Sequence, residues 1–302
     1  MEDLVATVKV FSQDKNWTEL KELLNESAPL ILKNAAKIDD SLASLDPEQH
    51  TLAYVIFMTC KMALPSYGDF ELLFNQVEQL IQICCKEQVQ QGMDKFAHIC
   101  HFLTRCLLEN RQPKRGIMLM MVAIEKCQRL PTELTSVHAD LLQLCLAAKL
   151  FHPCLSYLET DITEINNEFG HYDTKSYLLY YFYGGLVYTA LKKYEKALFF
   201  FEMCVTAPAM AVSHIMKEAY WKYILVSIYL HGKVVPLPKY VSAIVNRALK
   251  PLSSAYTELA TAYATYDPEQ LRACANKHQQ IFQRHSNVGM VKQVIGMNFT
   301  QV

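Results

Sequence analysis

The sequence predicts an all-α fold, a right-handed superhelix of irregular helix hairpins stacked as an α-solenoid. First, the 302 residues include only 9 glycines and 11 prolines, about half of what average usage gives, so there is little material for the many turns of a sheet protein. Second, apolar residues recur at helical spacing, and no segment of four or more residues alternates strictly between apolar and polar, so we expect no sheet. Third, hairpin-like segments repeat along the chain.

The residues from Phe70 to Cys84 predict an early helix. Their apolar side chains recur at i, i+3, i+4 and i+7, which places one apolar stripe along a helix. Two further helix starts are predicted at Asp46 and Asp267. Each offers an N-cap carboxylate, a proline at the first helical position, and a glutamine three residues on that closes a capping box.

The segment 178–208 is the clearest repeating unit, and it resembles a tetratricopeptide repeat. Five of its residues take the places of the Trp, Gly, Tyr, Ala and Phe of that pattern: Tyr181, Gly185, Tyr188, Ala197 and Phe201. Gly185 and Ala197 are small, which predicts that they face each other where two antiparallel helices approach closely. Residues 191–194 form the predicted turn between these helices.

Weaker copies of this unit lie on both sides of it. The positions that correspond to Ala197 are Gly116, Cys154, Leu237 and Leu271, at intervals that vary where a strict tetratricopeptide array keeps a constant one. A hairpin of this kind cannot bury its apolar face alone and has to stack on its neighbours. We therefore expect one continuous tetratricopeptide-like repeat domain over residues 1–293, with residues 294–302 as a divergent C-terminal tail.

The sequence carries no motif of catalysis or of cofactor binding. It has no nucleophile elbow, no phosphate-binding glycine loop and no dinucleotide fingerprint. The densest cluster of His and Cys runs from His98 to His101. On a helix Cys100 points away from both histidines, and no CxxC or HExxH spacing supports a zinc site. We predict that the chain is not an enzyme and has no catalytic, metal-binding or cofactor-binding residues.

Charge and hydropathy argue against nucleic acid and membrane partners. The net charge is −1, whereas phosphate binding needs clustered Lys and Arg. The aromatic run 177–188 contains no Lys or Arg, so it lacks the positive charge that a binding surface for single-stranded nucleic acid needs. The longest uncharged stretch, residues 176–191, has 16 residues and falls short of the ~20 needed to span a bilayer.

A more specific resemblance rests on four blocks, residues 134–149, 207–216, 222–240 and 244–260. In this order they resemble the subunit 3 family of the COP9 signalosome, and the block APAMAVSHIM is not expected in a generic tetratricopeptide protein. The resemblance implies a non-catalytic scaffold subunit, in the cytoplasm and nucleus, of a complex that deneddylates cullins and so regulates cullin–RING ubiquitin ligases and ubiquitin-dependent proteolysis. It implies other signalosome subunits as direct partners, cullin–RING ligases as indirect ones, and an isopeptidase zinc centre on a different subunit.

The resemblance also implies a helical arm followed by the winged-helix part of a PCI domain. After Gln293 the family continues into further helices, whereas residues 294–302 do not resemble that continuation, so we expect the winged helix to be absent from this chain. Two other interpretations stay open. One is a tetratricopeptide adaptor that grips a peptide carboxylate with Lys and Asn, although its groove positions here are the apolar Leu179, Phe182 and Leu186. The other is a scaffold of the proteasome-lid type.

The segment 207–216 supplies the candidate partner contact. Pro208 predicts that one helix ends or the next begins there. We interpret Met210, Ser213 and His214 as the candidate partner-contact residues, because methionine packs adaptably at protein surfaces and the histidine can offer a hydrogen bond. The alternative interpretation is an ordinary loop between repeats.

Overall fold

The computed structural model describes residues 2–66, 68–165 and 173–298, and within them the regular secondary structure is almost entirely helical. The described residues form two compact units, one that ends at Ser176 and one that begins at Tyr177. The all-α class predicted from the sequence is therefore confirmed. The single continuous repeat domain over residues 1–293 stays a prediction.

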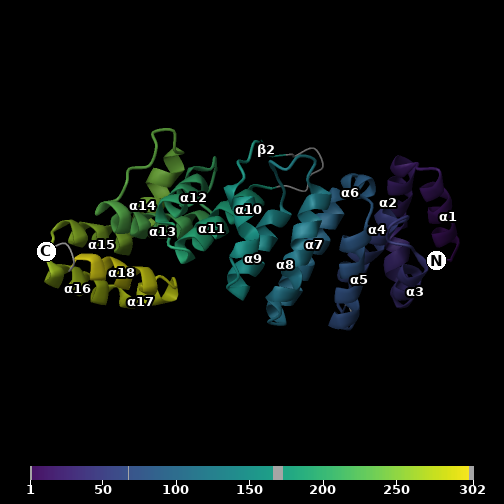
Figure 1. Ribbon diagram of the computed structural model, residues 1–302, viewed down its shortest axis with the longest axis horizontal. Helices are drawn as coiled ribbons and strands as arrows, with labels where there is room; N and C mark the ends of the chain where they lie inside the picture. Colours follow the sequence, from purple (N-terminus) through teal and green to yellow (C-terminus); the bar gives the residue numbers. More distant parts are fainter. Residues whose placement is uncertain (1, 67, 166–172, 299–302) are drawn as a thin grey trace. The chain divides into compact units, whose positions relative to one another are not determined.

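The first unit is built of helices that lie beside their neighbours in the sequence (Figure 1). Its centre is a run of three long helices, in which α8 packs against both α7 and α9. The elements of this unit are α1 (Glu2–Gln13), α2 (Trp17–Lys33), the 3-10 turn η1 (Ala35–Lys37), α3 (Ile38–Ser44), α4 (Thr51–Met62), α5 (Phe70–Ile83), α6 (Lys86–Gln91), α7 (Met93–Glu109), α8 (Pro113–Cys127), β1 (Glu133–Leu134), α9 (Val137–Ala148), α10 (His152–Glu159) and β2 (Glu164–Ile165).

The apolar stripe predicted between Phe70 and Cys84 is confirmed in α5. Its buried residues follow the helical period and are Leu73, Phe74, Val77, Leu80 and Ile81. The helix begins after Asp69, whose carboxylate accepts a hydrogen bond from the Leu72 amide at 3.4 Å, and it ends at Ile83. Local sequence is sufficient to place this helix because its cap and its stripe both lie within the segment itself.

The helix start predicted at Asp46 is wrong, since α4 begins at Thr51 and residues 47–50 form a turn. The reason is a side chain far away in the sequence. Gln88 on α6 accepts a hydrogen bond from the Leu52 amide at 3.0 Å and donates one to the Gln49 carbonyl at 2.9 Å. A buried glutamine thus bonds backbone groups at the start of α4, while the Asp46 carboxylate accepts a hydrogen bond from the Glu48 amide at 2.9 Å in the preceding turn.

The start predicted at Asp267 is confirmed, because α16 begins at Pro268. The Asp267 carboxylate accepts hydrogen bonds from the amides of Glu269 at 2.9 Å and Gln270 at 3.4 Å. The Asp267 amide itself bonds to the Thr265 hydroxyl at 3.3 Å. The aspartate and proline therefore act as predicted, while the amide that Gln270 was expected to bind has another partner.

The expectation of no sheet is wrong in one place. Glu133 and Leu134 pair in parallel with Glu164 and Ile165, which gives two strands of two residues each. The pairing is extended by the Thr163 amide, which donates to the Thr132 carbonyl at 3.1 Å. Four residues are too few to show an alternating pattern in the sequence, so this ladder connects the segments that flank α9 and α10 without a local signal.

The second unit contains most of α11 and the helices that follow it. Within this unit α13 packs against α12, α15 and α18. The elements are α11 (Thr174–Ala190), α12 (Tyr194–Thr206), α13 (His214–His231), the π-helical turn η2 (Val245–Leu249), α14 (Lys250–Leu252), α15 (Ser254–Ala264), α16 (Pro268–Lys277), α17 (Gln279–Arg284) and α18 (Val288–Asn298). No helix in the described ranges is both long and apolar enough to cross a bilayer.

The hairpin predicted for residues 178–208 is formed by α11 and α12. Their contact is aromatic, because Phe200 packs against Tyr181 and Tyr188 with ring centroids 5.3 and 5.1 Å apart. At the turn Lys192 takes a left-handed conformation with φ of 58°, and the Lys193 amide bonds to the Tyr188 carbonyl at 2.9 Å. The aromatic side chains of the run 177–188 are buried or half-buried, as core residues are.

The atoms nearest to Gly185 belong to Phe201, and the predicted contact of Gly185 with Ala197 stays a prediction. A Cβ added at Gly185 would lie 2.5 Å from Cε1 and 2.7 Å from Cδ1 of the Phe201 ring. Phe201 and Ala197 are both fully buried and four residues apart, so they share one face of α12. The close approach predicted for Gly185 is present, but a ring at the next turn of the helix provides it.

The weaker repeat copies have different outcomes. Gly116, Cys154 and Leu271 lie in α8, α10 and α16 and are buried, as the repeat predicts. Leu237 does not lie in a helix, because residues 234–238 have no regular structure. It stands between Pro236 and Pro238, each of which lacks an amide hydrogen and restricts the residue before it.

His138 is a buried titratable group in the first unit. It lies on α9 and is 1% exposed. Burial lowers the pKa of His138 to about 4, against the opposing effect of a hydrogen bond with the Thr135 backbone. The ring is therefore neutral at physiological pH and costs free energy to protonate in the folded state.

Substitution of Gly185 tests the contact with Phe201. We expect Gly185→Ala to lower the free energy of unfolding by about 1–3 kcal/mol, because the added methyl group overpacks a buried ring. Gly289, on α18 of the same unit, has nothing within 4 Å of an added Cβ. Gly289→Ala should therefore leave stability unchanged or slightly raised. Urea unfolding measures both, and equal effects of the two substitutions would contradict the assigned contact.

The pH dependence of stability tests the burial of His138. Its folded-state pKa lies below the unfolded value, so its contribution is fully present above about pH 6.5 and is lost as pH falls toward 4. The loss is up to about 1.4 kcal/mol for each pH unit in that window. We expect His138→Gln to reduce this slope in urea unfolding at pH 7 and 5. The exposed His152 provides the control, since His152→Gln should keep the wild-type slope.

Candidate functional site

The segment between α12 and α13 contains the candidate contact residues. α12 ends at Thr206, and Ala207 has an extended ψ of 134°, as predicted for the residue before Pro208. The chain then runs without regular helix to Ser213, and α13 begins at His214. The break predicted at Pro208 is confirmed as the end of the preceding helix.

Met210 is the most exposed large apolar side chain among those that the structure describes, at 98% exposure. It borders an open surface pocket of 590 Å³ in the second unit. The pocket is lined by Tyr177, Met203, Thr206, Ala207, Pro208, Ala209, Met210, Tyr240 and Ser242. None of these residues carries a formal charge at neutral pH, so the pocket is an apolar surface with a few hydroxyl groups.

Tyr240 reaches this pocket from a segment 30 residues further along the chain, and it is 74% exposed. The two segments are connected by a hydrogen bond in which the Ser242 hydroxyl donates to the Ala209 carbonyl at 3.5 Å. On the other wall, burial raises the pKa of the Tyr177 phenol, which therefore stays protonated as a hydrogen-bond donor. No local pattern indicated Tyr240, because the irregular segment that carries it was expected to be helical.

Ser213 and His214 lie beside the pocket's segment but do not line it. The Ser213 hydroxyl accepts a hydrogen bond from the Met216 amide at 3.1 Å and so caps α13. The His214 side chain is 71% exposed, and its Nδ1 lies 3.3 Å from Glu218 Oε1. Of the three predicted contact residues, only Met210 borders the pocket. Ser213 acts on the local backbone, and His214 presents its ring to solvent at the first turn of α13.

The histidine cluster of α7 does not converge on a common site. His98 is exposed, Cys100 is buried, and His101 Nδ1 lies 2.5 Å from Asp140 Oδ2 on α9. Burial lowers the pKa of His101, but the hydrogen bond to Asp140 and the negative charge of nearby carboxylates together outweigh it and hold the pKa above its usual value. This pair connects two packed helices.

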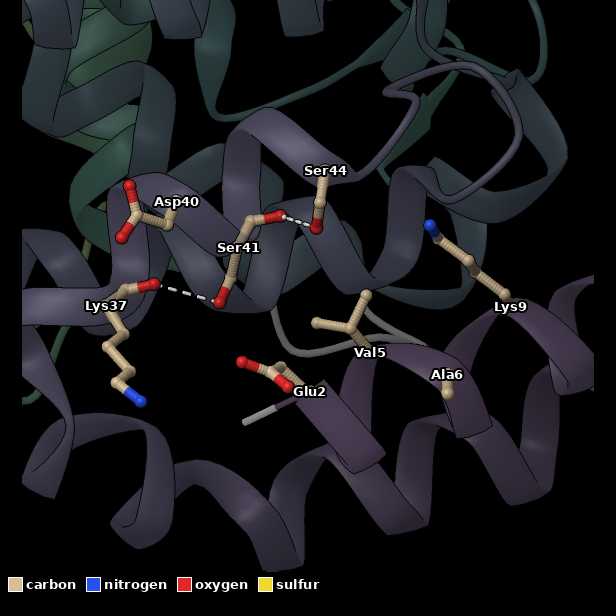
Figure 2. Close-up of a pocket in the computed structure, with 8 residues that line it drawn as sticks. All are labelled: Glu2, Val5, Ala6, Lys9, Lys37, Asp40, Ser41 and Ser44. Carbon is tan, nitrogen blue, oxygen red and sulfur yellow. Dashed lines mark hydrogen bonds between the residues drawn. The ribbon is translucent and has the colours of Figure 1, made fainter.

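A second pocket, of 390 Å³, lies in the first unit between α1 and α3 (Figure 2). Two acids and two lysines are among the residues that line it: Glu2, Val5, Ala6, Lys9, Lys37, Asp40, Ser41 and Ser44. Both serine hydroxyls donate to helix carbonyls, Ser41 to Lys37 at 2.9 Å and Ser44 to Ser41 at 2.7 Å. Both hydroxyl protons are engaged by helix carbonyls, so this arrangement does not resemble an activated nucleophile.

Three metal-capable side chains meet in the second unit. Glu258 on α15, Cys274 on α16 and His278 at the end of α16 each offer a ligand atom within 4.8 Å of the others. This group has neither CxxC nor HExxH spacing, so no metal-binding residue was predicted from the sequence. The available signal was the four-residue separation of Cys274 and His278, which places both on one helix face. The glutamate can be assigned only from the tertiary structure.

Comparisons with known proteins agree on one family. A family model described as the N-terminal helical repeats of COP9 signalosome complex subunit 3 matches residues 14–245. The chain is 36% identical to the COP9 signalosome complex subunit 3 of Drosophila melanogaster, over 97% of this chain and 70% of the relative. It is 33% identical to the protein of the same name from Dictyostelium discoideum, over 93% of this chain and 67% of the relative. The resemblance inferred from the four sequence blocks is confirmed.

The role of Ser213 can be tested by changing its side-chain oxygen. Ser213→Ala removes the acceptor for the Met216 amide, and we expect the free energy of unfolding to fall by about 1 kcal/mol. Ser213→Asp keeps an acceptor and adds a negative charge at a helix N-terminus, so it should retain wild-type stability. Urea unfolding measures both variants. An alanine variant as stable as the aspartate variant would contradict the capping role.

Proposed function

The chain belongs to the family of COP9 signalosome subunit 3, and on this premise we propose that it is a non-catalytic scaffold subunit that assembles with other signalosome subunits. Its contribution to cullin deneddylation, and through it to cullin–RING ligases and ubiquitin-dependent proteolysis, is then indirect. The observation that carries the proposal is the family match over residues 14–245, supported by identity to two curated subunits over nearly the whole chain.

The pocket beside Met210 supports a protein partner for this scaffold. It combines a fully exposed methionine with an exposed tyrosine, and its lining has no formal charge. Aromatic residues and methionine are enriched in the cores of protein interfaces, from which charged residues are depleted. An exposed apolar patch of this composition costs free energy in water, so a partner that covers it gains stability. We propose that Met210 and Tyr240 contact another subunit of the complex.

A tetratricopeptide adaptor for charged peptide tails is less well supported. The groove positions of α11 are Leu179, Phe182 and Leu186, of which Phe182 is buried and the other two are half-buried. These side chains cannot donate hydrogen bonds to a terminal carboxylate. A scaffold of the proteasome-lid type shares the helical architecture, but the matching family model is that of signalosome subunit 3.

Co-expression with the remaining signalosome subunits tests the proposal. We expect the wild-type chain to co-purify with them, and we expect Met210→Asp combined with Tyr240→Asp to reduce the recovered complex by more than about tenfold. Two carboxylates would be desolvated in an apolar contact without partners, which is a cost typical of interface hot spots. Circular dichroism and thermal melting should show both proteins equally folded, because the two side chains are exposed.

Met118→Asp is the matched control, since Met118 is 64% exposed on α8 in the first unit and does not line the pocket. It should leave assembly unchanged. His214→Ala tests the third candidate residue separately. If the double variant assembled as well as the wild-type chain, the surface around Met210 and Tyr240 would not be part of an interface. Failure of the folded wild-type chain to co-purify with any signalosome subunit would contradict the scaffold function itself.

A further inference from the structure

The hairpin of α15 and α16 brings a carboxylate, a thiol and an imidazole together at its surface. Glu258 comes from α15, while Cys274 and His278 come from the last turn of α16 and its C-cap. The His278 amide donates to the Cys274 carbonyl at 3.2 Å, so helical spacing continues through the cap and both side chains share one face. Their ligand atoms and a carboxylate oxygen of Glu258 all lie within 4.8 Å of one another.

From this geometry we propose that Glu258, Cys274 and His278 bind a zinc ion. Sulfur, imidazole nitrogen and carboxylate oxygen are the three ligand types that zinc accepts in proteins, and three protein ligands leave one position for water. In a tetrahedral site, zinc–ligand distances of ~2.0–2.3 Å place ligand atoms roughly 3.3–3.6 Å apart. The three ligand atoms lie within 4.8 Å of one another, and side-chain rotations can bring them to that range, since Glu258 is exposed and Cys274 is half-buried.

The charges around the three residues favour a cation. The Glu258 carboxylate forms an ion pair with the Lys277 ammonium group, so the group supplies an anionic ligand. Zinc binds the thiolate form of cysteine, so binding to Cys274 releases the thiol proton to solvent.

Lys277 forms an ion pair with the Glu258 carboxylate and therefore competes with zinc for that ligand. Its Nζ lies 2.8 Å from Glu258 Oε2, and His278 Nε2 lies 2.7 Å from the same oxygen. The Lys277 side chain is 65% exposed, so it can move into solvent with little desolvation cost. Zinc then takes the place of an ammonium group on Glu258, with His278 coordinating through a ring nitrogen in its neutral form.

Accessibility separates Cys274 from most of the other cysteines. Eight of the ten cysteines are buried, and only Cys85 and Cys274 are half-buried. The eight buried thiols have the surroundings of small apolar core residues. Cys274 has an imidazole and a carboxylate beside it and solvent access for an ion. Cys85, with the same exposure class and no place in this group, is the matched control.

Cobalt(II) titration of the full chain tests the proposal, because cobalt substitutes for zinc and its bond to a thiolate gives a charge-transfer absorption. We expect the reduced wild-type chain and the Cys85→Ser variant to bind one cobalt per chain with this absorption, and zinc to displace it. Cys274→Ser should abolish the absorption. His278→Ala should weaken binding at least about tenfold, the loss typical even of outer-shell partners. Zinc should also raise the melting temperature of the wild-type chain, and a chelator should reverse the shift.

The Lys277→Gln variant tests whether Glu258 is a metal ligand without changing Glu258 itself. Removal of the competing ammonium should tighten cobalt binding, and binding no tighter than wild type would remove Glu258 from the ligand set. Thiolate absorption that persists in Cys274→Ser, or that disappears in Cys85→Ser, would overturn the site. Absence of the absorption in the folded wild-type chain would overturn it as well. Each outcome is independent of whether the chain assembles with other subunits.

Discussion

The fold depends on the burial of helix faces that no single hairpin can cover. Gly116 shows how closely the helices have to approach for this burial. A Cβ added there would lie 2.5 Å from Leu107 Cδ1 on α7 and 2.8 Å from Leu144 Cδ1 on α9. The absence of a side chain thus lets α8 pack against two neighbours at once. Because neighbouring helices within a unit share their core, the hydrophobic effect stabilises them together and no hairpin alone.

This mode of stabilisation leaves the connecting segments free for contacts with partners. The hairpin of α11 and α12 buries its aromatic residues between the helices, so Phe201 is fully buried while Met210, just beyond the end of α12, is almost completely exposed. Loops that connect stacked helices carry little of the core, and their side chains can change without loss of the fold. An apolar loop pocket on a rigid helical support has the properties that a scaffold subunit needs: a fixed position and an uncharged surface that a partner can cover.

The candidate site could be predicted in part. Met210 was found because Pro208 and the apolar residues after it indicate an exposed break between helices. Tyr240 was not found, because its place beside Met210 depends on how the segment after α13 returns to α12. The capping role of Ser213 was readable in principle, since a serine immediately before a long apolar helix is a common N-cap. Of the three residues of the proposed zinc site, only Cys274 and His278 could have been grouped from the sequence, because they lie four residues apart on one helix face. Glu258 could not.

The sequence by itself determined the helical class, the apolar stripe of α5, the start of α16 at Asp267 and the end of α12 before Pro208. Each of these follows from residues within one or two helical turns, where backbone geometry fixes which side chains meet. The tertiary structure decided the start of α4, the ladder of β1 and β2, and the partner of Gly185. The amide of Leu52 bonds to Gln88, 36 residues away. Hydrogen bonds and ring contacts of this kind depend on which helices become neighbours, and that is settled by packing over the whole core.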